Sequence, residues 1–169
     1  MSGVRKVQSC PVLVAGCGNL MAGDDGFGPL VVREVAVRAP RGVEVVDLGL
    51  QPAGLLDHLP GRAGVVVVDA VLAGEGVVYE LLDVDCVQTE GDALMLERAG
   101  SSHAMGLAWQ LSLARALGIL PPFVRLIALS IPRAELGVDI SEQAAGRVAG
   151  AVELVLKWAE IYLKGQPDV

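Results

Sequence analysis

Three places in the sequence carry residues whose types and spacing could do chemistry. A Gly-rich loop, GCGNLMAGDDGFG, contains the neighbouring acids Asp24 and Asp25. A run of valines ends in Asp69, and His103 follows a pair of serines. Two carboxylates and one imidazole suit a borderline divalent metal ion, and the two carboxylates would balance its charge. Asp25, Asp69 and His103 are therefore candidate metal ligands.

The expected place of His103 supports a ligand role. Ser101 or Ser102 can cap a helix that starts at His103. The dipole at the start of a helix favours neutral imidazole, which is the form that binds a metal.

Each acid follows an apolar run that is typical of a buried strand. The run PVLVA, residues 11–15, leads into the loop Gly16–Pro29, and VVVVD, residues 65–69, places Asp69 directly after its strand. Ligands of open α/β sheets bind beyond the carboxyl ends of the strands. We therefore expect Asp25 and Asp69 to face the same edge of one sheet.

The rest of the chain alternates between patterns typical of strands and of helices. The connection before the run at 77–82 is too short for a parallel crossover, so that strand should be antiparallel. We predict a three-layer α/β/α sandwich with a mostly parallel twisted sheet of about five strands, forming a single domain over residues 1–169 with its core at about 11–164. The predicted strands are 11–15, 43–47, 65–69, 77–82 and 123–129, and the predicted helices are 30–37, 52–59, 93–98, one from 103 to Gly118 and a final one capped by Ser141.

Composition narrows the classes of partner. The chain is 53% apolar with a net charge of −7, and its Lys and Arg residues form no stripe, so we expect no nucleic-acid partner. No apolar run approaches the roughly 18 residues that span a bilayer, so we expect no membrane contact. Three scattered cysteines without a CxxC pair, and a start without a signal-peptide core, favour the reducing cytoplasm.

Other interpretations of the loop stay open on the residues alone. The loop begins G-x-G as a dinucleotide-binding turn does, with Asp47 as a possible ribose ligand, but Met21 stands where the third glycine belongs. Asp24 and Asp25 would also repel a pyrophosphate. Cys17 could be a protease nucleophile, but no histidine with an orienting residue accompanies it in the sequence.

Each of the three candidate ligands also has a purely structural interpretation. Asp25 could cap the following helix, Asp69 could be a turn residue, and His103 could be a surface residue at a helix start. Four further members of the loop are expected to shape it rather than to bind a metal. These are Gly18, Asn19, Asp24 and Gly26.

Taken together, three motifs resemble those of the hydrogenase maturation endopeptidases. They are VLVAGCGNLMAGDDGFGP, VVVVDA and SSHAMG, in the family's order, and the resemblance runs from Val12 to about Leu163. It implies that Asp25, Asp69 and His103 are the metal-binding and catalytic residues. Many members have Glu at the position of Asp25, so the ligand type is retained with one methylene fewer.

The resemblance also implies a substrate. These enzymes remove a C-terminal peptide from the large-subunit precursor of a nickel-iron hydrogenase after nickel insertion, so nickel is expected with the substrate rather than resident in the enzyme. We expect the chain to act as a monomer. The general base stays open between Asp24 and a metal-bound hydroxide. Alternatives are a non-catalytic nickel-dependent binding or chaperone module for the large subunit, a peptidase for another precursor, and a nucleoside-processing enzyme on the same architecture.

Overall fold

A computed structural model describes residues 10–87 and 102–165, with residues 102–105 described by their backbone alone. The predicted helix at 93–98 lies outside the described residues. No helix within the described ranges is both long enough and apolar enough to cross a membrane.

A five-stranded mixed sheet forms the centre of the fold, in the order β2-β1-β3-β5-β4. Strands β2, β1, β3 and β5 run parallel, and β4 runs antiparallel to β5. This confirms the predicted mostly parallel sheet with one antiparallel strand. The strands are β1 (Val12–Cys17), β2 (Val43–Gly49), β3 (Gly64–Leu72), β4 (Leu81–Asp85) and β5 (Phe123–Ile131).

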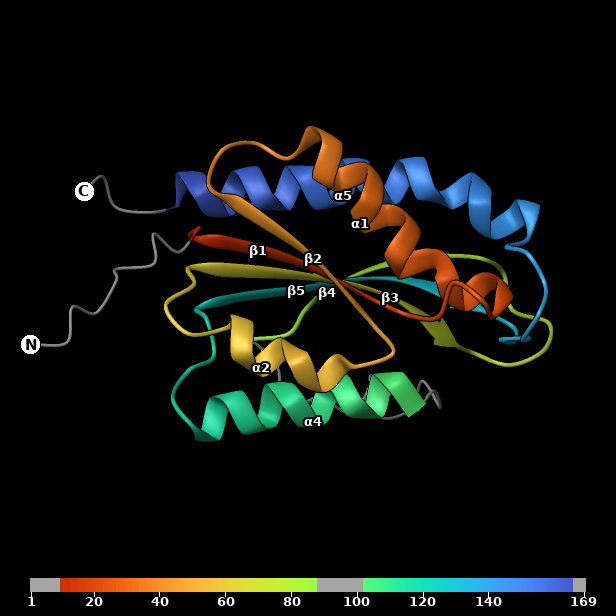
Figure 1. The fold of residues 1–169 in the computed structure, drawn as a ribbon, viewed down its shortest axis with the longest axis horizontal. Coiled ribbons are helices and arrows are strands. Elements are labelled where there is room, and N and C mark those ends of the chain that lie inside the picture. The colour runs from red at the N-terminus through yellow and green to blue at the C-terminus, as the bar shows by residue number, and fades with distance from the viewer. Residues whose placement is uncertain (1–9, 88–101, 166–169) are drawn as a thin grey trace, which may run out of the picture.

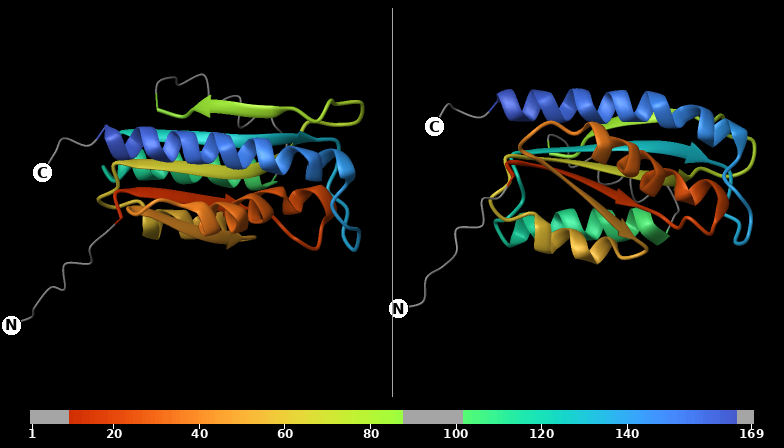
Figure 2. Two further views of the ribbon diagram at one scale, coloured as in Figure 1. Left: turned by 90° about the horizontal axis from the view of Figure 1, so that it is seen from above. Right: turned by 45° about the horizontal axis from the view of Figure 1, so that its top comes forward.

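Helices cover both faces of the sheet, which confirms the three-layer sandwich. In Figure 1, α1 and α5 lie on one face and α2 and α4 on the other, and Figure 2 shows the same layers from two further directions. Two short 3-10 helices, η1 and η2, precede α1 and α2. The helices are η1 (Gly23–Gly26), α1 (Phe27–Arg38), η2 (Pro52–Gly54), α2 (Leu55–His58), α4 (Ser102–Ala116) and α5 (Glu142–Lys164).

The valine run of β3 is buried because helices pack on both of its faces. Val66 and Val68 belong to the core beneath α1 and α5, whereas Val65 and Val67 belong to the core above α2 and α4. Parallel strands covered on both faces show continuous apolar runs rather than alternation. The pattern VVVV is therefore explained by the position of β3 at the centre of the sheet.

All five strands differ from their predicted bounds by at least one residue, and two of these differences bear on the site. The antiparallel strand begins at Leu81 rather than at residue 77, because Leu81 pairs with Leu129 and β5 ends at Ile131, so residues 77 and 78 lie beyond the end of β5. Strand β3 continues to Leu72, so Asp69 lies inside the strand and not after it. Pairing of β3 with β1 ends at Val68, whereas its pairing with β5 continues through Leu72. Asp69 thus lies at the point where β3 loses one neighbour.

The last helix starts where the sequence predicts. The hydroxyl of Ser141 accepts a hydrogen bond from the backbone N–H of Ala144 at 3.2 Å, which confirms the predicted N-cap of α5. On α4, Leu107, Leu111 and Ala114 form a buried apolar stripe that faces the sheet.

Candidate active site

The loop between β1 and α1 folds back on its own backbone. Gly18 has a φ of 136°, and a Cβ atom at this position would lie 2.0 Å from the carbonyl oxygen of Asp25. Only glycine permits both this backbone conformation and this close approach. The backbone N–H of Asn19 then donates to Oδ2 of Asp25 at 2.8 Å, and Asn19 Oδ1 accepts from the N–H of Met21 at 2.9 Å. The loop thereby orients the Asp25 carboxylate.

Close packing of α1 brings this loop onto the edge of the sheet. A Cβ atom on Gly28 would lie 2.1 Å from the Cys17 carbonyl oxygen and 2.7 Å from that of Val68. The start of α1 therefore contacts the end of β1 and the middle of β3, and η1 packs against β3. Asp25 does not cap α1, since the N-cap residue is Gly26 and no side chain bonds to that helix end.

Asp25 and Asp69 are both buried acids. Asp25 is 7% exposed and Asp69 is 1% exposed. Burial, above all, raises the pKa of Asp69 well above its ordinary value, and the charge of Asp25 raises it further. A hydrogen bond from the N–H of Ala70 to Asp69 Oδ1, at 2.8 Å, acts in the opposite direction. A buried carboxyl that feels the charge of a second one favours a bound proton or a nearby cation and disfavours an anion such as a pyrophosphate.

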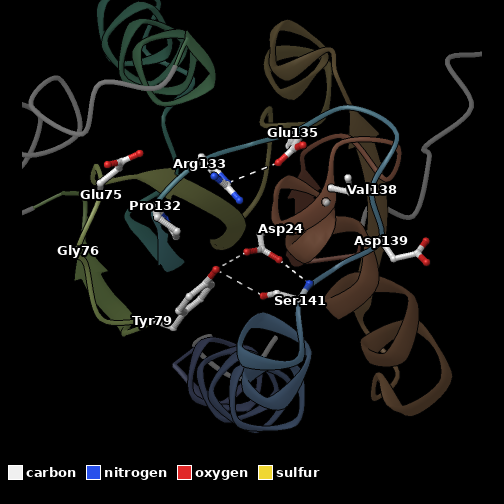
Figure 3. A pocket seen from close by; sticks show the side chains of 11 residues that line it. Asp24, Glu75, Gly76, Tyr79, Pro132, Arg133, Glu135, Val138, Asp139 and Ser141 are labelled. Atoms are coloured by element: carbon white, nitrogen blue, oxygen red, sulfur yellow. Dashed lines mark hydrogen bonds and ion pairs between the residues drawn. The ribbon is translucent and has the colours of Figure 1, made fainter.

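Asp24 makes different contacts from its neighbour. Its Oδ2 accepts a hydrogen bond from the Tyr79 hydroxyl at 2.6 Å, and its Oδ1 accepts one from the backbone N–H of Ser141 at 2.7 Å (Figure 3). The three residues line a pocket of about 360 Å³, together with Glu75 and Arg133 among others. Sequence reasoning found Ser141 as a helix cap only, and Tyr79 carried no signal of its own.

His103 is the second residue of α4, but its side chain lies outside the described residues. Its convergence with Asp25 and Asp69 therefore stays a prediction. Among the side chains that the structure describes, no three His, Cys, Asp or Glu residues form a group able to hold a metal ion. The other histidine, His58, ends α2, and its Nδ1 lies 3.6 Å from Oε1 of Glu44. Glu44 is near the start of β2, so His58 lies at the opposite end of the parallel strands from the acids.

Cys17 is close to the acids but is not activated. The side chain is 1% exposed, and burial raises the pKa of its thiol far above the usual range. The carboxylates of Asp69, Asp47 and Asp25, in that order, add to this effect. A nucleophilic cysteine requires the opposite, a lowered pKa beside a positive charge. The electrostatics of the site argue against a cysteine protease.

Comparison with known proteins gives one consistent result. The model of the hydrogenase maturation protease family (HycI) matches residues 29–158. A candidate hydrogenase maturation protease of Methanocaldococcus jannaschii is 30% identical over 149 residues, which cover 86% of this chain and 94% of that protein.

Solved structures agree with this assignment. The hydrogenase maturating endopeptidase HybD from E. coli has the same fold, with a TM-score of 0.78 at 23% identity over 89% of this chain and 92% of that one. The [NiFe] hydrogenase maturation protease HybD from Thermococcus kodakarensis is 25% identical, with a TM-score of 0.69 over 88% of this chain and 98% of that one. The chain, with its buried acids at the carboxyl edge of the sheet, belongs to the hydrogenase maturation protease family.

Proposed function

We propose that this protease removes a C-terminal extension from the nickel-loaded large-subunit precursor of a nickel-iron hydrogenase. In this proposal the enzyme recognises the nickel through Asp25, Asp69 and His103. Membership of the family supplies the class of reaction, and the Thermococcus relative carries [NiFe] in its name. The nickel belongs to the substrate.

The buried acid pair is the observation that supports nickel recognition most directly. A carboxylate removed from water is costly unless a cation or hydrogen-bond donors compensate it. Asp69 receives one backbone hydrogen bond and faces the charge of Asp25, so the enzyme alone leaves this carboxyl with a raised pKa. A divalent cation would reverse that balance, because it favours the ionised form of both acids.

The proposed ligand set leaves room for the substrate. Asp25, Asp69 and His103 are three ligands, fewer than the four that close a structural site around a borderline metal. The remaining positions would be filled by the precursor's own ligands. Because the nickel is held by both proteins, its capture would also fix the precursor against the enzyme, and holding a scissile bond in place is itself a large part of catalysis.

Recognition through the metal would act as a checkpoint. A precursor without nickel would bring no positive charge to compensate the two buried acids of the enzyme. Cleavage would then follow nickel insertion, because only the loaded precursor relieves the electrostatic cost at Asp69. The chain's part in the hydrolysis is to hold the loaded precursor while water adds across the peptide C–N bond.

Intact-mass measurement of a nickel-loaded large-subunit precursor, with and without the enzyme, tests the proposal. We expect loss of one C-terminal peptide from the precursor and recovery of that peptide in solution. Asp25→Asn, Asp69→Asn and His103→Ala should each prevent this, whereas Asp47→Asn, which removes another carboxylate close to Cys17, should not. Tight binding of the loaded precursor without any change in its mass would contradict the proposal, as would normal cleavage by all three site variants.

A further inference from the structure

Asp24 is held from two directions by segments that lie far from it in the sequence. Tyr79 comes from the connection between β3 and β4, and Ser141 is the N-cap residue of α5. Their donors reach the two different oxygens of the Asp24 carboxylate, at 2.6 Å and 2.7 Å (Figure 3). The acid therefore joins three parts of the chain around η1.

These are hydrogen bonds of the stronger kind. Bonds to an ionised carboxylate are shorter and roughly twice as strong as bonds between neutral groups. Asp24 is 8% exposed, so water competes little for its oxygens. The Ser141 N–H also belongs to the start of α5, where the helix dipole favours a negative charge.

Backbone contacts bind the same turn to the loop before α5. The N–H of Gly23 donates to the carbonyl oxygen of Val138 at 3.1 Å, and the N–H of Gly137 donates to that of Met21 at 2.8 Å. On the side of the turn, these two bonds involve Met21 and Gly23, which come just before Asp24 in the sequence. Together with the carboxylate contacts, they fix the turn from which Asp25 extends.

We infer that Asp24 is a positioning residue, which holds η1 so that the Asp25 carboxylate stays in place beside Asp69. The inference rests on the proposed function, because it is the role of Asp25 towards nickel that requires this placement. Both oxygens of Asp24 already accept hydrogen bonds from the protein. This arrangement suits an anchor and does not suit a base that must take a proton from water.

Two substitutions of Asp24 separate an anchor from a base. In Asp24→Asn the amide oxygen can still accept from Ser141, and the amide nitrogen can donate to the Tyr79 oxygen. If Asp24 is an anchor, Asn can replace it. The kcat/KM for the nickel-loaded precursor should then fall by no more than about tenfold, the effect of losing one hydrogen bond. Asp24→Ala removes both contacts and should lower kcat/KM by about 100-fold, the scale of a misplaced catalytic group.

The two tyrosines of the chain provide a matched control. Tyr79→Phe removes one bond to Asp24. Tyr162→Phe removes the hydroxyl of a buried residue, 4% exposed, whose ring stacks on Phe123 at the start of β5 and hence at the opposite end of the sheet. The readout is the preference of the enzyme for binding nickel-loaded over nickel-free precursor, measured well below the Tm of each variant. We expect Tyr79→Phe to reduce this preference by about tenfold and Tyr162→Phe to leave it unchanged.

Each outcome bears on the inference. If Asp24→Asn loses cleavage as completely as Asp24→Ala does, the inference is overturned and Asp24 is identified as a base. Equal preferences for nickel in the two tyrosine variants would also overturn it, because the Asp24 contact would then serve stability alone. The three site variants keep the two proposals apart. If Asp25→Asn, Asp69→Asn and His103→Ala all cleave normally, the proposed function fails and the positioning inference fails with it. If those variants are inactive, either of the two outcomes just given overturns the positioning inference alone.

Discussion

The charge of Asp25, on the η1 turn, raises the pKa of Asp69 in the neighbouring strand β3. Burial of Asp69 raises that pKa more strongly still, and the backbone N–H of Ala70 lowers it only in part. The metal-free enzyme thus holds an acid in surroundings that disfavour its charge. This relationship leads to predictions for stability as well as for activity.

Asp69→Asn should stabilise the metal-free enzyme at neutral pH. Below the ordinary pKa of 3.8 the carboxyl is protonated in both the folded and the unfolded chain, so it imposes no cost. As the pH rises above that value the unfolded chain loses its proton first, and the folded state loses stability until the raised folded pKa is passed. The Tm of the variant should match the wild type near pH 4 and exceed it by at least about 2 °C at pH 7, the shift that about 1 kcal/mol gives in a domain of this size.

Calorimetry or circular dichroism across this pH range would measure the difference. A gap between the two proteins that stays constant with pH would show that the Asp69 carboxyl is not perturbed by folding.

The effect of substituting Asp25 on cleavage should depend on the charge of the new side chain more than on its length. Asp25→Glu keeps the carboxylate and adds one methylene, so cleavage of the loaded precursor should fall by no more than about tenfold. Asp25→Asn keeps the size and loses the charge, and should cost about 100-fold or more. Steady-state kinetics on one precursor preparation would compare them. The reverse order would show that shape, and not cation binding, is the requirement at this position.

His103→Ala should abolish cleavage and leave the fold intact. The residue is the second of α4, and we expect its substitution to change the Tm by less than about 2 °C. His58→Ala provides the control, because His58 ends α2 at the opposite end of the sheet and should be dispensable for cleavage. An active His103→Ala enzyme would remove this histidine from the site.

The thiol of Cys17 should resist alkylation in the native enzyme. Burial and the nearby carboxylates raise its pKa, and the thiolate is the reactive form. Iodoacetamide at pH 8 should leave Cys17 unmodified in the folded protein and modify it after unfolding, as peptide mass spectrometry would show. The treated enzyme should still cleave. Rapid modification of Cys17 with parallel loss of activity would instead favour a cysteine mechanism.

Much of the fold could be predicted because the apolar patterns leave few alternatives. The runs at β1 and β3 are buried on both faces, and the short connection before β4 excludes a parallel crossover. The end of β3 could not be predicted. The strand continues through Asp69 because β5 still pairs with it there, and a neighbouring strand's length is not visible in the β3 sequence.

The candidate site could be predicted only in part. The acids Asp25 and Asp69 were found from their positions after apolar runs, and the structure places Asp25 in η1 after β1 and Asp69 inside β3, where the pairing of β3 with β1 ends. Tyr79 could not be found. It follows a turn, has no motif around it, and reaches Asp24 only because the β3–β4 connection folds over η1. Contacts of this kind arise from tertiary packing and leave no local pattern.

The central claim is that the nickel arrives with the substrate, and an order-of-addition experiment with chelator tests it most directly. Enzyme that has been treated with chelator and then washed should cleave nickel-loaded precursor at the untreated rate, because an open set of three ligands does not retain an ion of its own. Precursor prepared without nickel should remain intact with any enzyme preparation. Intact-mass spectrometry would follow both reactions. If the washed enzyme stays inactive on loaded precursor and regains activity with added zinc, a resident catalytic metal replaces substrate-borne nickel and the account is wrong.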